Sequence, residues 1–278
     1  MDEAKFTSRR SWKSRTMIGT LVCILLGGFL FTGWTIRQSD RYMREDLLYQ
    51  ARLVAQAVDI RRILSLSGSD ADLTAVDYLQ LKEQLAFTKR TITDCKFIYL
   101  LGRRENGSVF FFADSDPSGS KDESPAGQLY EEISDEDIRA FEEKRALTTG
   151  PASDRWGTRI SALEPLTDND SGDLVAILGI DFAARDWQRK LAKTALPPVL
   201  LTLFTIALWV VGACLINRRS FPAGLSFHRQ SYQETLLVIV LAGFFLSLAA
   251  TWTIRTFTLQ TRQNAFRQLA QEKTAAIT

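Results

Sequence analysis

Three long uncharged runs constrain this chain more than any other feature of its sequence. Residues 16–36, 194–217 and 235–254 contain no Asp, Glu, Lys or Arg. Each run reaches the roughly 20 residues that a helix needs to cross the hydrocarbon core of a bilayer. Trp34, Trp209 and Trp252 accompany the runs, as tryptophans often do near membrane interfaces. We therefore expect three transmembrane helices; the alternative for such runs is a set of buried helices in a soluble protein.

The charges that flank these runs predict an orientation. The tail 1–15 carries five basic and two acidic residues, and the loop 218–234 carries three basic residues and one acidic residue. The positive-inside rule places both segments in the cytoplasm. Residues 37–193, with 22 basic and 28 acidic residues, then lie outside, as does the segment 255–278. The first run is too long for a signal-peptide core and no A-x-A site follows it, which favours an uncleaved anchor.

The outer segment begins with helical patterns. Leu47, Ala51, Val54 and Val58 recur at the spacing of one helix face. This apolar stripe is either a dimer seam or the face that packs onto the domain, and we expect a homodimer. A Ser/Gly/Asp-rich break, "SLSGSDAD", separates it from a second predicted helix over residues 76–91.

The period then changes to that of strands. The runs "KFIYLL" and "SVFFFAD" are joined through Asn106-Gly107, and Asn-Gly between such runs is a strong hairpin signal. The sequence Ser134-Asp135-Glu136-Asp137 predicts the start of a short helix with a capping box. "RWGTRISALEPL" and "LVAILGIDF" predict two more strands, and a last helix begins at Ala183. This order describes an α+β domain with a small antiparallel sheet and both ends at the membrane.

Two segments carry a family resemblance. "VFFFADSDPSGSKDESPAGQLYEE" and "GPASDRWGTRISALEPLTDNDSGDLVAILGIDFAARDW" resemble the extracytoplasmic Cache sensor domains (PAS-like, also called PDC) of bacterial membrane receptors. The resemblance covers residues 37–193 and is strongest over 99–187. It implies a long N-terminal helix and a central antiparallel sheet that cups a small-molecule pocket. It also implies a multi-pass protein of the bacterial inner membrane that is coupled to a histidine kinase or a cyclic-dinucleotide enzyme.

The stretch "WTIR" occurs twice, at residues 34–37 and 252–255, each time where an uncharged run ends. Trp at the headgroup level followed by Arg is expected where a helix leaves the membrane. The residues after the second copy, "TFTLQTRQNAFRQLAQEKTAAIT", are similar to the start of CHASE-type extracytoplasmic sensor domains. We therefore expect 255–278 to begin a second sensor module and the chain to be the front part of a longer receptor.

This sequence lacks the residues that several kinds of chemistry require. Cys23 and Cys214 lie in uncharged runs, so Cys95 alone in the outer domain forms neither an intradomain disulfide nor a zinc site. His228 is followed by Arg-Gln rather than by the acidic residue of a kinase phosphoacceptor site. No Gly-rich nucleotide motif is present. We expect no catalytic domain, no cofactor and no nucleic-acid partner in this chain.

The acidic loop "DSDPSGSKDESP" raises the question of a calcium site. Asp114, Asp116, Ser118 and Gly119 fit the first half of an EF-hand loop, but Pro125 stands where a bidentate Glu is required. We expect no metal here and favour a solvated loop near the mouth of the pocket.

The strands supply the candidate ligand site. In "GTRISALE", alternation places Arg159, Ser161 and Leu163 on one face. Asp181 ends an apolar strand, where it either caps the following helix or contributes to a ligand site with Arg159 or Trp156. Tyr99 and Tyr130 are aromatic walls of the pocket or core residues. The candidate ligand-binding residues are Tyr99, Asp114, Tyr130, Trp156, Arg159, Ser161 and Asp181.

A cation and an anion on neighbouring strands suit an amino acid or a short carboxylate as ligand. Arg can hold a carboxylate through two parallel hydrogen bonds. On that hypothesis, replacing Arg159 by Ala abolishes stabilisation by the ligand while the unliganded domain stays folded.

These observations predict a signal-input region, in which an outer domain binds a small molecule and shifts the helices at its two ends. The alternative is a non-signalling membrane assembly or transporter-associated subunit whose outer domain binds a protein. The runs contain only Ser, Thr, Asn217 and Cys as polar residues, which argues against a substrate path through the membrane.

Overall fold

The computed structural model describes residues 3–168, 170–218, 243–244 and 247. The chain divides into two compact units, one of residues 34–195 and the other of residues 1–33 together with 196–278. Among the described residues, two helices are long and apolar enough to cross a membrane, Met17–Ala57 and Ala184–Cys214. They cover all but the ends of the first two runs predicted as spans, 16–36 and 194–217. The third predicted span, 235–254, and the expected second sensor module at 255–278 lie outside the described residues, apart from residues 243, 244 and 247.

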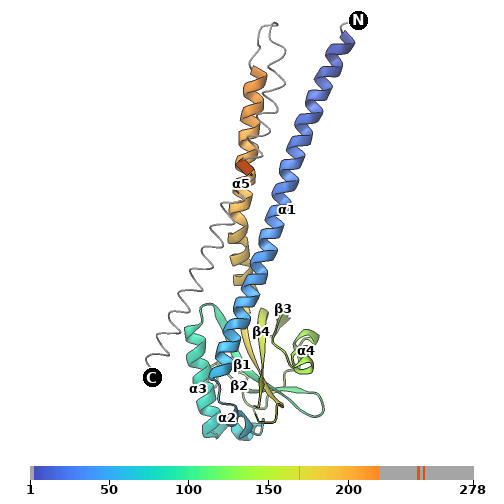
Figure 1. The fold of residues 1–278 in the computed structure, drawn as a ribbon. Coiled ribbons are helices and arrows are strands. Elements are labelled where there is room, and N and C mark those ends of the chain that lie inside the picture. Colours follow the sequence, from blue (N-terminus) through green and yellow to red (C-terminus); the bar gives the residue numbers. More distant parts are fainter. Residues whose placement is uncertain (1–2, 169, 219–242, 245–246, 248–278) are drawn as a thin grey trace, which may run out of the picture. The chain divides into compact units, whose positions relative to one another are not determined.

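The unit 34–195 starts with the C-terminal part of helix α1 (Glu3–Ala57). The side chains of Leu47, Ala51 and Val58 are buried in the core of the domain, and Val54 packs against it. The apolar stripe is therefore the face that packs onto the domain and is not a dimer seam. A short helix α2 (Ile60–Leu64), a 3-10 helix η1 (Asp70–Thr74) and helix α3 (Val76–Thr91) follow (Figure 1). The observed bounds of α3 are those predicted from the sequence.

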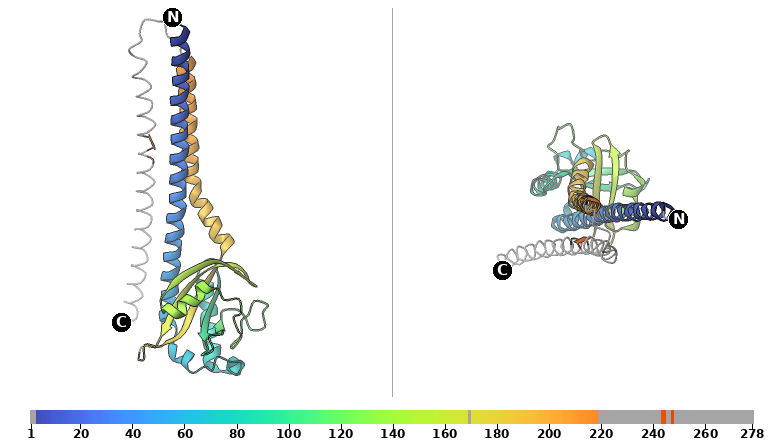
Figure 2. Two further views of the ribbon diagram at one scale, coloured as in Figure 1. Left: turned by 90° about the vertical axis from the view of Figure 1, so that its right-hand side faces the viewer. Right: turned by 90° about the horizontal axis from the view of Figure 1, so that it is seen from above.

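The centre of the domain is one antiparallel sheet in the order β2-β1-β5-β4-β3. Its strands are β1 (Cys95–Arg103), β2 (Val109–Asp114), β3 (Leu147–Asp154), β4 (Gly157–Thr167) and β5 (Leu174–Ala183). Strands β1 and β2 form the predicted hairpin, although only Gly107 in its turn takes a positive φ, of 86°. Figure 2 shows that the sheet is strongly curved.

Strand β3 is absent from the sequence-based prediction. It is the edge strand that pairs with β4, and its pairing is interrupted between Thr149 and Ala152 by a bulge that contains Gly150 and Pro151. Gly and Pro in a short segment argue against a strand, yet both are tolerated at bulges and sheet edges. The domain consequently has five strands where the pattern predicted four.

The alternation predicted for the strands separates two clusters of buried side chains, one on each face of the sheet. On one face Ile160, Ala162, Ala176, Leu178 and Ile180 pack with the helices α1, α2 and α3. On the other face Leu163 and Ile177 pack with helix α4 (Asp135–Glu143) and the loop that precedes it. Figure 1 shows α3 and α4 on opposite sides of the sheet. The second face carries the polar cluster described below.

Asp181 lies inside β5, two residues before the strand ends, and helix α5 (Ala184–Arg218) begins after Ala183. Its carboxylate is 2% exposed and bonds across the sheet rather than to the first turn of α5. The interpretation of Asp181 as a helix cap is therefore wrong, because the strand continues past it.

Candidate functional site

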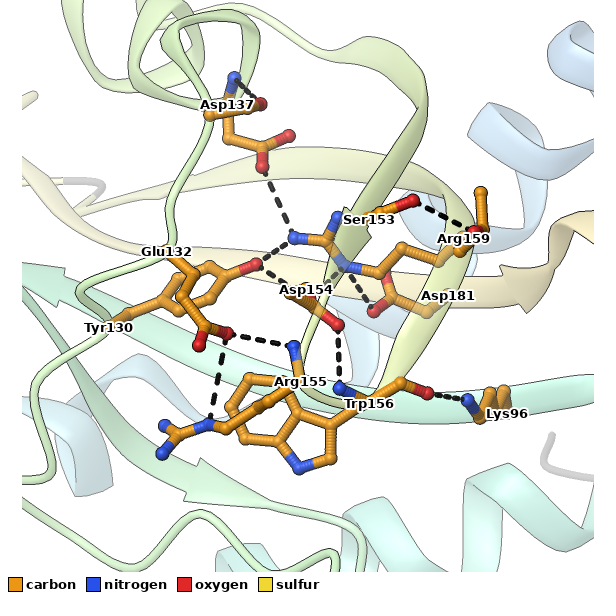
Figure 3. Close-up of polar contacts among 12 residues, drawn as sticks. Lys96, Tyr130, Glu132, Asp137, Ser153, Asp154, Arg155, Trp156, Arg159 and Asp181 are labelled. Atoms are coloured by element: carbon orange, nitrogen blue, oxygen red, sulfur yellow. Dashed lines mark hydrogen bonds and ion pairs between the residues drawn. The ribbon is translucent and has the colours of Figure 1, made fainter.

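Arg159 lies at the centre of a buried polar cluster on the α4 face of the sheet (Figure 3). Its Nε lies 3.1 Å from a carboxylate oxygen of Asp154 and 3.1 Å from one of Asp181. One terminal nitrogen lies 3.3 Å from Asp137 and donates to the hydroxyl of Tyr130. All four charged side chains are at most 5% exposed. Two of the three guanidinium nitrogens, Nε and Nη2, are therefore directed at groups of the protein itself.

Four different elements bring these groups together. Arg159 is on β4 and Asp181 on β5, and the register pairs Ser161 with Asp181. Asp154 ends β3, where the turn to β4 is fixed by the bond from the Trp156 amide to the Asp154 carboxylate, 2.9 Å long. Asp137 comes from the first turn of α4, whose N-cap is Ser134. The predicted helix start is confirmed, but the Asp137 carboxylate accepts from Thr149 Oγ1 at 2.6 Å and faces Arg159.

The cluster holds more negative than positive charge, with three carboxylates around one guanidinium. Burial raises the pKa of Asp137 and of Asp154 above the ordinary range. Burial also raises the pKa of Asp181 to about 6, although the positive charge of Arg159 opposes this shift. Burial penalises the charged form of a carboxyl group and so favours the protonated one. The site is an acidic environment that a second positive charge would stabilise.

Aromatic side chains form the walls next to this charge. Phe111 lies at the centre of them, with ring centroids 5.8 Å from Tyr99, 5.2 Å from Tyr130 and 6.0 Å from Trp156. Tyr99 crosses the strand surface above Gly179, where a β-carbon would collide with its ring, and its hydroxyl donates to Asp181 at 2.9 Å. Together with Phe97, Asp154, Arg159 and Asp181, these rings line a cavity of about 20 Å³, whereas Asp137 lies behind Arg159 and outside the lining. A space of that size holds about one water molecule.

The loop 115–128 forms part of the wall of this cavity, because its residues Asp122 and Ser124 contribute to the lining. The loop is tied to α3 through Lys82, whose ammonium lies 2.5 Å from Asp114 and 3.0 Å from Glu123. The second oxygen of Asp114 accepts from the Ser124 amide at 2.6 Å. Burial alone would lower the pKa of Lys82, but its hydrogen bonds to the two carboxylates outweigh burial and raise the pKa.

The loop is near the cavity, as predicted, but its first residues are not solvated. Asp114 and Asp116 are buried, and each pairs with a lysine of α3, Lys82 and Lys89 respectively. The half EF-hand pattern thus corresponds to two ion pairs that tie the loop to the helix.

Six of the seven candidate residues line the cavity, namely Tyr99, Asp114, Tyr130, Trp156, Arg159 and Asp181. Ser161 is buried opposite Asp181 but does not belong to the lining. The sequence-based prediction did not include Asp137 and Asp154. Asp137 had been assigned to a capping box, and Asp154 lies in the strand that the pattern did not reveal.

The raised pKa of Asp181 predicts how stability depends on pH. In the unfolded chain this carboxyl ionises near its ordinary value of 3.8, whereas in the folded chain it ionises near 6. Between these values the folded state holds the extra proton, so the free energy of unfolding falls as pH rises from about 4 to 6 and is level above. Over this pH range Asp181 lowers the free energy of unfolding by roughly 3 kcal/mol in total, because each pKa unit corresponds to about 1.36 kcal/mol.

Urea unfolding of the purified chain at pH 4.5 and at pH 7.5 measures this dependence. Asp181→Asn should reduce the difference between the two pH values, because the amide does not titrate. The other buried carboxyls with raised pKa, such as Asp137, leave a residual slope of the same sign. An unchanged difference in the Asn variant would exclude Asp181 as its main source.

Comparison with known proteins gives a limited result. No family model and no curated protein matches the chain. Among solved structures, the chain is similar to the ligand-binding domain of Campylobacter jejuni chemoreceptor Tlp3 in complex with L-valine, at 16% identity and a TM-score of 0.36, with 66% of each chain covered. The sensory domain of the same receptor with isoleucine bound gives 15% identity and the same TM-score and coverage.

The periplasmic domain of RsbU from Chlamydia trachomatis is similar at 20% identity and a TM-score of 0.27, over 58% of this chain and 56% of that one. The proteins that this chain is similar to are thus sensory and periplasmic domains, and it spans just under two thirds of the first of them. At TM-scores this low, no ligand and no residue role passes from them to this chain.

Proposed function

We propose that this chain is a membrane-anchored signal-input region whose outer domain, residues 34–195, binds a small molecule. One observation carries the proposal: the domain that holds the buried charged cavity begins and ends with helices, α1 and α5, that continue into the two candidate membrane spans. A structural change in the domain then reaches both spans without an intervening flexible linker. The output, a histidine kinase or a cyclic-dinucleotide enzyme by resemblance, is proposed to lie outside this chain, which itself has no catalytic role.

The geometry favours a ligand with an ammonium group. The Nε and Nη2 donors of Arg159 already face three carboxylates, so they are not both free to hold the carboxylate of a ligand through two parallel hydrogen bonds. The surplus negative charge of Asp137, Asp154 and Asp181 attracts a cation instead. The faces of Tyr99, Tyr130 and Trp156 add attraction for a cation through their electron-rich rings. This replaces the sequence-based hypothesis that Arg159 holds a carboxylate.

Binding requires the site to open, because a cavity of about 20 Å³ has room for about one water molecule. Trp156 is half-buried at its edge and Asp122 is on the exposed part of the loop 115–128. We propose that movement of these two elements admits the ligand. A ligand that binds the open arrangement more tightly shifts the population towards it, by an amount set by the difference in affinity.

Thermal unfolding of the purified full chain with matched small molecules tests the proposed function. The probes are L-valine, isobutylamine (which lacks its carboxylate), isovalerate (which lacks its amine), putrescine and tetramethylammonium. We expect the melting temperature to rise with cationic probes and not with isovalerate. A probe at a hundred times its dissociation constant stabilises the folded state by about 2.7 kcal/mol.

Asp181→Asn should weaken the response to the cations, since it removes one of the surplus charges. A response to isovalerate and none to the amines would preserve small-molecule sensing and exclude the ammonium ligand. No response to any probe would contradict the proposed function itself.

A further inference from the structure

A set of three residues near the end of the domain joins α1, α5 and the sheet; we call Asp40, Arg44 and Trp187 the helix node. Arg44 Nε donates to one oxygen of Asp40 at 2.9 Å, and the indole N–H of Trp187 donates to the other oxygen at 2.7 Å. The guanidinium of Arg44 also lies 5.8 Å from the Trp187 ring centroid. Both helices are therefore fixed to each other through one carboxylate.

The helix node is also bonded to the bulge of β3. A terminal nitrogen of Arg44 donates to the carbonyl oxygen of Gly150 at 3.1 Å. Gly150 has a φ of +91°, and a β-carbon there would collide with the carbonyl oxygen of Arg159 and the amide of Ala152. The bulge is thus packed directly against the backbone of the residue at the centre of the acidic site. A shift of Arg159 and a shift of Gly150 are sterically coupled.

A second connection runs through side chains. Thr149, which precedes Gly150, donates its hydroxyl to Asp137 at 2.6 Å, and Asp137 lies 3.3 Å from Arg159. The Gly150 amide donates to Glu136, the neighbour of Asp137 on α4, at 3.2 Å. Thr149 and Asp137 are each about 2% exposed, so an unpaired partner would remain buried at a cost. The bulge is therefore connected to the polar cluster around Arg159 both through strand β3 and through helix α4.

We propose that the β3 bulge at Gly150 relays the state of the acidic site to α1 and α5 through the helix node. The contacts form one continuous series from Arg159 through Asp137 and Thr149 to Gly150, Arg44, Asp40 and Trp187. Occupation of the site changes the position of Asp137 or of the Arg159 backbone, and the bulge carries that change to the carbonyl that Arg44 holds. The inference rests on the proposed sensing function for its purpose, whereas the coupling itself is testable without a ligand. Spatial continuity alone does not establish coupling, so the test has to perturb one end and observe the other.

Hydrogen–deuterium exchange of the full chain in detergent provides this test, with Thr149→Val as the perturbation. The matched control is Thr167→Val, the same substitution at an exposed position at the end of β4. We expect Thr149→Val to speed amide exchange roughly tenfold in residues 38–47 of α1 and 184–191 of α5, the factor for loss of about one buried hydrogen bond. Exchange in α3 should not change, and Thr167→Val should leave α1 and α5 as in the wild type.

Arg44→Met distinguishes a relay from a local effect of Thr149. It removes the bond to Gly150, so it should raise exchange in the same segments of α1 and α5, and Thr149→Val should then add nothing further. Faster exchange confined to β3 and α4 in Thr149→Val would overturn the proposal, as would faster exchange everywhere, including α3. Fully additive effects of the two substitutions would overturn it as well. The ligand experiment above tests sensing separately, so the two proposals fail by different results.

Discussion

Replacing Arg159 by Ala is expected to lower the free energy of unfolding by about 3–5 kcal/mol. The guanidinium is the only cation among the described residues that lies within ion-pair distance of the buried carboxylates of Asp137, Asp154 and Asp181. Breaking a buried ion pair by removing one partner is costly because the remaining charge stays in the interior without compensation. That the unliganded Ala variant stays folded remains a prediction, to which the buried ion pairs add that its free energy of unfolding is lower than that of the wild type.

Urea unfolding followed by near-ultraviolet circular dichroism measures this effect, because Tyr130 and Trp156 lie in the cluster. Arg139→Ala is the matched control, since Arg139 on α4 is about half exposed and lies 4.0 Å from its partner Glu136. Its loss should change stability by no more than about 0.5 kcal/mol. Adding Asp181→Asn to Arg159→Ala should restore part of the stability, because it removes one of the unpaired charges. A loss below about 1 kcal/mol in Arg159→Ala would show that the cluster is hydrated rather than buried.

Lys82→Ala is expected to have an effect of similar size, about 3–5 kcal/mol, for the same physical reason. The ammonium is buried and bridges Asp114 on β2 with Glu123 in the loop 115–128. Its removal leaves two carboxylates close together and releases the loop from α3. The expected result is lower stability together with faster proteolysis of the loop, whereas loss of global stability alone would contradict its role as an anchor.

Lys89→Ala is the matched control for this second prediction. Lys89 lies two turns further along α3 and pairs with Asp116 at 2.9 Å, but its side chain is 26% exposed against 9% for Lys82. Lys89 is more exposed and pairs with one carboxylate rather than two, so its loss should cost less than that of Lys82, although Asp116 itself is buried. Equal losses in the two variants would mean that burial does not decide the strength of these pairs.

The parts of the fold that the sequence predicted are those in which a periodic pattern has a single physical solution. The stripe from Leu47 to Val58, the helix 76–91 and the alternation along "GTRISALE" each repeat at the period of a helix or a strand, and each has the expected buried face. The hairpin at Asn106-Gly107 follows from the backbone freedom of Gly107.

The parts that the sequence did not predict depend on long-range partners. Strand β3 contains Gly150 and Pro151 and is held by pairing with β4, which local propensity does not encode. Asp137 has the spacing of a capping residue, and only the fold shows that its carboxylate turns towards Thr149 and Arg159. For the same reason the charge of the site was misjudged. The alternation along the strands placed the cation Arg159 beside the anion Asp181. The two further carboxylates, of Asp137 and Asp154, come from α4 and β3, whose positions the sequence pattern did not predict.

The absence of a side chain at Gly179 restricts which substitutions this site can accept during evolution. The ring of Tyr99 fills the volume that a side chain at 179 would need, and its hydroxyl holds Asp181. A mutation that enlarges residue 179 therefore requires a smaller residue at 99, and the exchange removes the hydroxyl that orients the carboxylate. Residue 179 therefore cannot enlarge alone, and enlarging it together with a smaller residue at 99 removes the polar contact to Asp181. If the domain binds a small molecule as proposed, a change at Asp122 meets no such constraint, because Asp122 is exposed and also lines the cavity.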